Sequence, residues 1–347
     1  MEETRRLIFN QETEEDQIVS LSLRPASLKD FIGQKSLMEN LQVSLQAAKK
    51  RKEPIEHILF SGPPGLGKTS LAYIIAHEMD ARITLSSGPA INRAGDLIGI
   101  LTNLEAGDVF FIDEIHRLSK AVEEFLYPAM ENFQIDFIVD KGPYAKSIKF
   151  NLKPFTLIGA TTRSGLLAAP LRDRFGIFHH LDFYNEKDLT EIILNSAQKL
   201  NVDIDEEAAF EIAQRARGTP RVANRLLRRV RDYAQVKTAH PKITKAVVDS
   251  AMQTLGIDHA GLDESDRRLI RVMQEYYQGG PVGIEALAAT LNEEVDTLVD
   301  CIEPFLLKIG FLKRTSRGRE LTEPSLKHIH AASFPQEKLQ KELFDGS

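Results

Sequence analysis

The residues best suited to chemistry in this sequence form a glycine-rich stretch, "GPPGLGKT", at 62–69. It matches G-x-x-x-x-G-K-[ST], in which the glycines allow backbone N–H groups to surround phosphates. An apolar run, "HILF", precedes it, and a helical pattern, "SLAYIIAHEM", follows, so a helix N-terminus adds partial positive charge. We expect Lys68 to reach the outer phosphates of a nucleotide and the Thr69 hydroxyl to hold Mg²⁺. A plain glycine turn is the alternative, and motif and context together argue against it.

Two carboxylates, Asp113 and Glu114, follow the apolar residues of "DVFFIDEIHR". Asp113 would position the metal and Glu114 would polarise the attacking water, because phosphate hydrolysis depends on positioning and on charge stabilisation. An acidic pair after a strand is often only a solvated turn, but the upstream phosphate motif favours the catalytic interpretation. His116 is expected to be an ordinary histidine at a helix start, although it could tune the site.

Further along, polar and basic residues could complete a hydrolytic site. Thr161 and Thr162 end the run "FTLIGATT", and either could orient water and sense the terminal phosphate. Arg174, in "PLRDRFG", carries a planar guanidinium that suits the charge spread over a transferring phosphoryl group. A surface ion pair is the alternative for Arg174 and for its neighbour Arg172. Arg221 follows a proline suited to the first turn of a helix, from which it could swing toward a γ-phosphate.

The elements that must position these residues are those of an α/β domain. Residues 56–185 alternate short apolar runs with helical patterns, which is typical of a parallel sheet covered on both faces. The expected strands are "HILF", "RITL", "DVFFID" and "FTLIGATT". The expected helices between them are "KTSLAYIIAHEM" and "KAVEEFLYPAME", and "SLQAAKKRKEP" predicts an earlier helix that ends at Pro54.

We predict three domains and a tail. A large nucleotide-binding domain covers 1–185, a small all-helical domain covers 186–256, a winged helix covers 257–335, and a polar tail covers 336–347. The winged helix is indicated by three helical patterns, "DESDRRLIRVMQEYY", "GIEALAATLN" and "EEVDTLVDCIEPFLLKIG", followed by two short strands about a basic turn, "FLKRTSRGRELT".

The basic turn of the predicted winged helix contains Lys313, Arg314, Arg317 and Arg319. Clustered cations of this kind contact phosphates and carry no sequence information, which suits sequence-independent binding of duplex DNA. Two alternatives remain: many winged helices bind proteins, and basic turns are usually only solvated.

Bulk properties limit the class of protein. With 347 residues the chain is long enough for two or three domains, and its net charge of −6 means that any nucleic-acid contact must come from a local patch. The single cysteine, Cys301, excludes an internal disulfide, and its apolar surroundings, "TLVDCIEPFLL", predict burial. No apolar run has the length of a membrane span and the charged N-terminus is no secretory signal, so we expect a cytoplasmic protein.

The order of the motifs resembles the AAA+ ATPases: phosphate loop, Asp-Glu strand, polar strand end, arginine segment and helical lid. The resemblance implies a parallel-sheet P-loop domain, a small helical lid domain and, here, a C-terminal winged-helix domain. It also implies that Arg174 points into the site of the next subunit, as an arginine finger, so that hydrolysis depends on assembly. Arg221 matches the family's second sensor, which would act on the nucleotide of its own subunit.

A narrower resemblance covers about residues 20 to 325. The stretches "LSLRPASLKDFIGQ", "GPPGLGKTSLAYIIAHEM", "FIDEIHRL", "GATTRSGLLAAPLRDRFG" and "GTPRVANRLLRRVRDYA" are similar to the bacterial AAA+ motors that drive branch migration of Holliday junctions. This implies an ATP- and Mg²⁺-dependent hydrolase that forms homohexameric rings on duplex arms, in recombination and DNA repair. It also implies two protein partners, a junction-binding protein that docks on a hairpin at 133–152 and a junction resolvase.

The same resemblance implies the nucleotide-binding residues, with Tyr184 closing the adenine pocket. They are Leu23, Arg24, Ile32, Gly65, Leu66, Gly67, Lys68, Thr69, Ser70, Glu131, Asn132, Phe133, Arg174, Tyr184, Pro220 and Arg221. Arg314 and Arg319 match the DNA-contacting positions, and Arg317 lies between them.

The sequence departs from these relatives at two positions. Asn132 stands where they usually carry aspartate, and Val295 stands in the third helix of the winged helix where many have arginine. The first change matters only if the contact is made by the side chain, and the second argues against base reading by that helix.

In the hairpin, Ile148, Phe150 and Leu152 are expected to share an apolar face that would fit a partner.

Two other functions are consistent with the motifs. One is an ATP switch that loads or recruits other proteins, since clamp-loader subunits have similar motifs. The other is a DNA-binding regulator that holds ATP without cycling, and Asp113 and Glu114 argue against it.

Overall fold

The computed structural model describes residues 21–138, 147–238 and 241–331. The chain divides into two compact units, Met1–Val248 and Asp249–Ser347, and each is described by itself.

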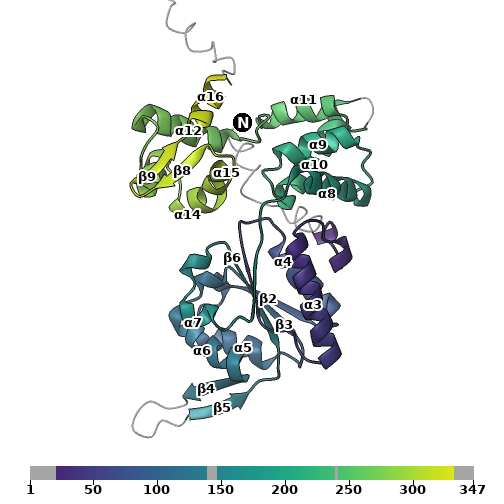
Figure 1. The fold of residues 1–347 in the computed structure, drawn as a ribbon, viewed down its shortest axis with the longest axis vertical. Coiled ribbons are helices and arrows are strands. Elements are labelled where there is room, and N and C mark those ends of the chain that lie inside the picture. The colour runs from purple at the N-terminus through teal and green to yellow at the C-terminus, as the bar shows by residue number, and fades with distance from the viewer. Residues whose placement is uncertain (1–20, 139–146, 239–240, 332–347) are drawn as a thin grey trace, which may run out of the picture. The chain divides into compact units, whose positions relative to one another are not determined.

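A five-stranded parallel sheet forms the centre of the first unit (Figure 1). The strand order is β2-β3-β6-β1-β7. The strands are β1 (Ile58–Ser61), β2 (Ile83–Ser87), β3 (Val109–Asp113), β6 (Thr156–Thr161) and β7 (Ile177–His180). Every residue of β6 is buried, and only the last residue of β3 is partly exposed, because helices cover both faces of the sheet. The four predicted strands are thereby confirmed. Sequence reasoning missed β7, an edge strand "IFHH" whose residues alternate between half-buried and exposed.

Helices lie on both sides of this sheet (Figure 1), with α3 and α4 on one side and α5, α6 and α7 on the other. Their bounds are α3 Lys35–Arg51, α4 Lys68–Glu78, α5 Ala94–Thr102, α6 Lys120–Asn132 and α7 Ala169–Arg172. Helix α3 ends at Arg51 and not at Pro54, because Lys52 turns into the left-handed region at φ 58° and its N–H closes the helix on Ala48 and Lys49. No sequence pattern predicted α5, a short helix that contains two glycines.

The carboxyl ends of the central strands meet at one edge of the sheet. Ser61 of β1 is in register with Thr161 of β6, and Ser87 of β2 is in register with Asp113 of β3. The phosphate loop leaves β1 at this edge, and α4 starts directly after Gly67, whose φ of 103° only glycine adopts easily. The topology therefore brings the loop, the acidic pair and the threonines together.

An antiparallel hairpin projects from the rest of the first unit (Figure 1). It consists of β4 (Gln134–Ile138) and β5 (Ser147–Asn151), which confirms the predicted hairpin. Its predicted tip, "KGP", and the side chain of Ile148 lie outside the described residues. The expected shared apolar face is only partly present: Phe150 is 50% exposed, whereas Leu152 is buried in the core with Ile135.

Helices follow the sheet in the remainder of the first unit, as predicted. They are α8 (Glu186–Lys199), α9 (Glu206–Arg215) and α10 (Pro220–Lys237), and α11 (Lys245–Leu255) spans the division between the two units. Local capping sets two of the starts, because the side chains of Asn185 and Thr219 accept hydrogen bonds from the N–H groups of Asp188 and Val222.

The second unit is a small helical domain with a two-stranded wing. Its elements are α12 (Glu264–Tyr277), α13 (Ile284–Leu291), α14 (Val295–Thr297), the π-helical turn η5 (Leu298–Ile302), α15 (Glu303–Lys308), β8 (Leu312–Thr315), β9 (Gly318–Leu321) and α16 (Glu323–Ala331). The order of three helical segments and a hairpin is the predicted one. The third segment is interrupted by the π turn, and α16 was not predicted. Val295 packs against the apolar core of this unit.

The expected burial of Cys301 is wrong, because the structure places this residue on the surface. Within the π turn, Leu298 and Ile302 face the core. Residue 301 points away from that side, so apolar neighbours in the sequence do not bury the thiol.

Candidate functional site

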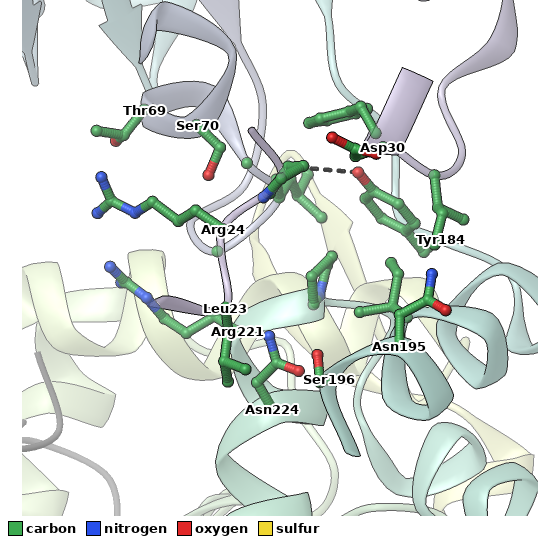
Figure 2. Close-up of a pocket in the computed structure, with 18 of the residues that line it drawn as sticks. Leu23, Arg24, Asp30, Thr69, Ser70, Tyr184, Asn195, Ser196, Arg221 and Asn224 are labelled. Atoms are coloured by element: carbon green, nitrogen blue, oxygen red, sulfur yellow. Dashed lines mark hydrogen bonds between the residues drawn. The ribbon is translucent and has the colours of Figure 1, made fainter. Parts of the chain in front are cut away.

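A cleft of about 840 Å³ lies in the first unit, bounded by the N-terminal segment, the phosphate loop, and helices α8 and α10 (Figure 2). Its volume is in the range of small-molecule sites. Most of the nucleotide-binding and catalytic residues expected from the sequence line it, from five separate parts of the chain. They are Leu23, Arg24, Ile32, Gly65, Leu66, Gly67, Lys68, Thr69, Ser70, Asp113, Glu114, Tyr184, Pro220 and Arg221.

The Lys68 ammonium is buried in the phosphate loop. It donates hydrogen bonds of 2.8 Å to the carbonyls of Gly62 and Pro63, and the residue is 7% exposed. Burial lowers the pKa of Lys68 to about 8, against the raising effect of the two nearby carboxylates, Asp113 and Glu114. A polyanion in the cleft would offset this desolvation, so the lysine is placed to bind phosphate.

The acidic pair at the end of β3 is held by local hydrogen bonds. Glu114 adopts a left-handed conformation, with φ 49°, and its N–H donates to Asp113 Oδ1 at 3.0 Å. The Thr162 hydroxyl donates to Glu114 Oε2 at 3.3 Å, and His116 Nδ1 lies 3.3 Å from the same oxygen. Glu114 therefore faces the cleft with its carboxylate already oriented.

The two threonines at the end of β6 have different surroundings. Thr161 is fully buried, accepts the N–H of Arg163 at 3.0 Å, and lies 2.9 Å from His116 Nδ1. Thr162 is half-buried and contacts Glu114 directly. His116 therefore contacts both Thr161 and Glu114. The expectation from the sequence was an ordinary histidine at a helix start, although a role in tuning the site was the alternative.

Tyr184 joins the first helix of the lid to the phosphate loop. Its hydroxyl donates to the Leu66 carbonyl at 3.3 Å (Figure 2). Its backbone N–H donates to the Gly218 carbonyl at 2.9 Å. Burial raises the pKa of the Tyr184 phenol well above its usual value, so the ring stays neutral. This tyrosine keeps the lid and the loop in contact at one end of the cleft.

The N-terminal segment is tied across the cleft to α8. Lys199 donates to the Arg24 carbonyl at 3.2 Å, and the Arg24 guanidinium lies 5.1 Å from the centre of the Tyr73 ring. Arg221 extends from the N-terminus of α10, where its N–H donates to the Gly65 carbonyl at 3.3 Å. The side chains of Arg24 and Arg221 extend in the same direction in Figure 2. The guanidiniums of Arg24 and Arg221 therefore border the cleft together with the ammonium of Lys68.

Arg174 lies outside the lining of this cleft. Its guanidinium forms an ion pair with Glu131 at 2.8 Å, donates to the Pro170 carbonyl at 2.5 Å, and stacks on the Tyr127 ring at 4.5 Å. Glu131 and the exposed Asn132 end α6. The structure thus groups Arg174 with the "ENF" segment.

The last residue of that segment, Phe133, packs against the rings of His57 and Phe155. None of the three residues of the segment lines the cleft of its own chain.

Sequence reasoning missed several polar residues of the cleft. Asn195, Ser196 and Lys199 of α8 and Asn224 of α10 line it together with Asp30. The helical spacing of residues 195 and 199 could have indicated a shared face, but polar positions on an amphipathic helix are normally solvated.

The donor set fits a nucleotide-bound Mg²⁺. Thr69 and Asp113 supply a hydroxyl and a carboxylate to the cleft, and Mg²⁺ is commonly held by one or two such oxygens together with substrate phosphates. Among the described residues there is no group of three or more histidine, cysteine or carboxylate side chains that could hold a metal alone. The site therefore suits a metal that arrives with its nucleotide.

The predicted DNA-contacting arginines lie on the wing of the second unit. Arg314 of β8 is directly opposite Arg319 of β9, and both form ion pairs with Glu303. Arg317 lies in the turn between the strands and is exposed.

The fold and the cleft define a P-loop ATPase of the AAA+ type, with a helical lid and a C-terminal winged helix. Three family models match in succession: the Holliday junction DNA helicase RuvB P-loop domain over residues 23–181, the RuvB AAA lid domain over 184–258, and the RuvB C-terminal winged helix domain over 259–330. The chain therefore belongs to the RuvB family of Holliday junction branch migration motors.

Two individual relatives and one solved structure support the same family assignment. The chain is 56% identical over 341 residues to a Holliday junction branch migration complex subunit RuvB of Chloroflexus aggregans, covering 98% of this chain and 97% of the relative. It is 54% identical to the protein of the same name from Desulfosudis oleivorans, covering 93% and 94% of the two chains. A solved structure, the Thermotoga maritima RuvB Holliday junction branch migration motor, is 52% identical, with a TM-score of 0.83 over 89% of this chain and 98% of that one.

Within the described part of the chain, no helix combines the length and apolar character needed to cross a membrane.

Proposed function

We propose that this chain is the ATP-driven motor subunit of Holliday junction branch migration, acting as a homohexameric ring around a duplex arm. Membership of the RuvB family supports the activity, and the cleft supports nucleotide binding. The observation that carries the ring is the position of Arg174, which lies outside the cleft of its own chain and is paired with Glu131. The resemblance to AAA+ ATPases implies a catalytic role for this arginine, and its position outside its own cleft supports action on another subunit.

Within one subunit, the residues divide the work of hydrolysis. Lys68 binds the outer phosphates, and Arg221 contacts the γ-phosphate from the start of α10. Glu114 accepts a proton from the attacking water. Thr162, 3.3 Å from Glu114 Oε2, is the threonine that orients this water, whereas the buried Thr161 supports it through His116. Thr69 and Asp113 would hold Mg²⁺, which would neutralise charge on the phosphates.

The neighbouring subunit completes the site. Arg174 donates to the transferring phosphoryl group of the next subunit in the ring, as an arginine finger does. Asn132 and Phe133 belong to the same face as the finger, next to Glu131, and we assign them to that shared site. In an isolated chain Glu131 holds the finger, and ring closure exchanges this carboxylate for a phosphate.

We assign the remaining parts of the chain to the DNA and to the protein partners. The winged helix, proposed to cover 257–335, holds duplex DNA through Arg314, Arg317 and Arg319 without reading its sequence. The β4–β5 hairpin, within 133–152, docks RuvA, and the half-exposed Phe150 offers an apolar contact there. RuvC joins as the resolvase of the complex. We assign the large domain at 1–185 and the lid at 186–256 to the motor, and a DNA substrate supports a cytoplasmic location.

Electron microscopy tests this proposal directly. The chain is mixed with ATP, Mg²⁺ and a synthetic four-way junction, with and without RuvA. We expect six-membered rings that encircle opposite arms when RuvA is present. Protein that binds ATP and hydrolyses it but stays monomeric on the junction would support an ATP switch that recruits other proteins, and would contradict a ring motor.

A further inference from the structure

A buried carboxylate lies beneath the two arginines of the wing. Glu303 is the first residue of α15 and is 1% exposed. Its Oε1 lies 2.8 Å from Nε of Arg314 and 2.8 Å from Nε of Arg319. Its Oε2 lies 2.7 Å from Nη2 of the first arginine and 3.3 Å from Nη2 of the second. One carboxylate therefore binds both guanidiniums side-on.

The wing requires such a counter-charge. Arg314 and Arg319 are directly opposite each other in the antiparallel pair of β8 and β9, and like charges in that arrangement repel. Burial raises the pKa of Glu303, but the hydrogen bonds and positive charges of the two arginines outweigh this effect and hold its pKa below the usual value. The carboxylate is thus ionised at neutral pH, and the three groups together carry one net positive charge.

The side-on geometry fixes which donors remain for another partner. Both arginines use Nε and Nη2 on Glu303, so the Nη1 group of each is left. No other acceptor contacts either guanidinium in the part of the chain that the structure describes. The Arg314 side chain is 52% exposed and that of Arg319 is 19% exposed, so both are accessible while their inner edges are held. The result is a pair of oriented donors on adjacent strands.

We propose that Glu303 is a positioning residue for DNA binding: it holds Arg314 and Arg319 in one orientation so that their outer N–H groups contact the phosphate backbone together. The inference rests on the proposed role of the wing in DNA binding. Long cationic side chains lose rotamer freedom when they bind, and a buried carboxylate removes most of that freedom before DNA arrives. The duplex then gains two phosphate contacts with little ordering of the protein.

Replacing Glu303 separates positioning from simple electrostatics by the sign of the effect. Glu303→Gln keeps the side-chain volume and one acceptor oxygen but removes the negative charge. If only charge mattered, the more positive wing would bind DNA more tightly and with a steeper salt dependence. If Glu303 positions the arginines, DNA binding weakens although the net charge has become more favourable.

The matched control is Glu320→Gln. Glu320 is on β9 and forms an ion pair of 2.8 Å with Lys313 across the strands, away from Glu303. The Glu320→Gln substitution produces the same change in net charge as Glu303→Gln without touching either held arginine. Fluorescence anisotropy of a labelled duplex, measured with the full chain over a series of salt concentrations, gives the affinity and the salt slope of each variant.

We expect Glu303→Gln to weaken DNA binding about fivefold to tenfold at every salt concentration, the cost of ordering one or two long side chains. The salt slope should be unchanged, because the number of phosphate contacts is the same. Glu320→Gln should bind DNA as well as the unaltered chain or more tightly. Binding by Glu303→Gln that equals or exceeds that of Glu320→Gln would overturn the proposal.

A second pair of variants keeps the test valid if Glu303→Gln does not fold. Arg319→Lys leaves a cation beside Glu303 but cannot bind it side-on through two nitrogens, whereas Arg317→Lys changes an exposed arginine that Glu303 does not hold. We expect the first variant to weaken DNA binding severalfold and the second to weaken it clearly less, because a lysine at 317 keeps a cation at the wing and disturbs no arginine that Glu303 holds. Equal affinities of the two variants would contradict positioning.

A double variant distinguishes failure of the proposed DNA binding by the wing from failure of the positioning role of Glu303. The double variant Lys313→Ala, Arg317→Ala removes two cations without exposing Glu303. If it also binds DNA as the unaltered chain does, the wing does not hold DNA, and the proposed function is what fails. If it weakens binding while Glu303→Gln does not, only the positioning role of Glu303 is refuted.

Discussion

Replacing Arg174 by alanine tests whether the hydrolytic site is shared between subunits. The substitution removes an ion pair with Glu131, whose side chain is 50% exposed, and a cation–π contact with Tyr127. An exposed ion pair contributes at most about 1 kcal/mol, and a cation–π contact of this kind contributes about 0.5–1 kcal/mol. The folded chain should therefore survive the change with a small loss of stability.

The expected loss of activity is much larger. An arginine finger accelerates hydrolysis by about 10³–10⁵-fold, which corresponds to roughly 4–7 kcal/mol of transition-state stabilisation. ATP binding should change little, because Arg174 does not line the cleft of its own chain. We therefore predict that Arg174→Ala binds ATP normally and hydrolyses it at least about 1,000-fold more slowly.

Mixing experiments give the sharper assay. In an equal mixture of Arg174→Ala and Lys68→Ala, a site works only when an Arg174→Ala subunit supplies Lys68 and its neighbour supplies Arg174. Random assembly into a ring with head-to-tail contacts makes about a quarter of the sites competent. Steady-state ATP turnover in the presence of DNA should rise accordingly, although each variant alone is inactive. Arg172→Ala is the control, and it should hydrolyse ATP at the normal rate.

Two outcomes would refute this reasoning. Undiminished turnover by Arg174→Ala would show that this guanidinium has no part in hydrolysis. Absence of rescue at every mixing ratio, with both variants assembled into rings, would show that one subunit owns the complete site.

Three further substitutions test the cleft. Burial lowers the pKa of Lys68 to about 8, so the unfolded chain binds more protons between that value and 10.5, and the nucleotide-free chain gains stability as pH rises through this window. Lys68→Met should therefore raise the free energy of unfolding of the nucleotide-free chain at pH 7 by about 3 kcal/mol, measured by urea unfolding. The difference in stability between this variant and the unaltered chain should be smaller at pH 9.5. Gly33→Ala would place a Cβ 2.6 Å from the Tyr184 ring at a φ of 79°, and should raise the dissociation constant for ATP about tenfold, or ~1.4 kcal/mol, in titration calorimetry. Thr162→Val removes the hydroxyl 3.3 Å from Glu114 Oε2 and should lower kcat about 100-fold with ATP affinity unchanged.

Each of these substitutions has a matched control. Lys29→Met changes an exposed lysine of the same cleft and should not alter stability. Gly107→Ala imposes similar backbone strain at φ 88°, but with nothing within 4 Å, so it should cost stability without affecting ATP binding. Thr161→Val removes the acceptor of the Arg163 N–H and should destabilise the fold by about 1–3 kcal/mol. If the control variant of any pair showed the expected effect and the test variant did not, the role assigned to the tested residue would be contradicted.

Local patterns in the sequence were sufficient to predict the end of the cleft that the phosphate loop forms. The phosphate loop, the acidic pair after β3 and the threonines after β6 are each encoded within a few residues, and parallel strands bring their carboxyl ends to one edge of the sheet. Lys68, Asp113 and Glu114 could therefore be predicted as one site, because the chemistry depends on short motifs and on a topology that alternating strands and helices impose.

Contacts between residues that are far apart in the sequence could not be predicted from local patterns. Glu131 ends α6 and gives no sign in the sequence that it holds Arg174. Glu303 lies in a stretch that predicts only a helix, yet its carboxylate binds two arginines of the wing. Ion pairs of this kind carry no periodicity and no fixed spacing, because any carboxylate that the fold brings within reach can form them.

The sequence by itself determined the class of fold and predicted most of the groups that line the cleft around the phosphate loop. Only the tertiary structure decided which partner each arginine has, which of the two threonines faces Glu114, and that Cys301 is exposed. The physical reason is that backbone conformation and phosphate binding follow from neighbouring residues. Side-chain burial and charge pairing depend instead on which surfaces meet after the chain has folded.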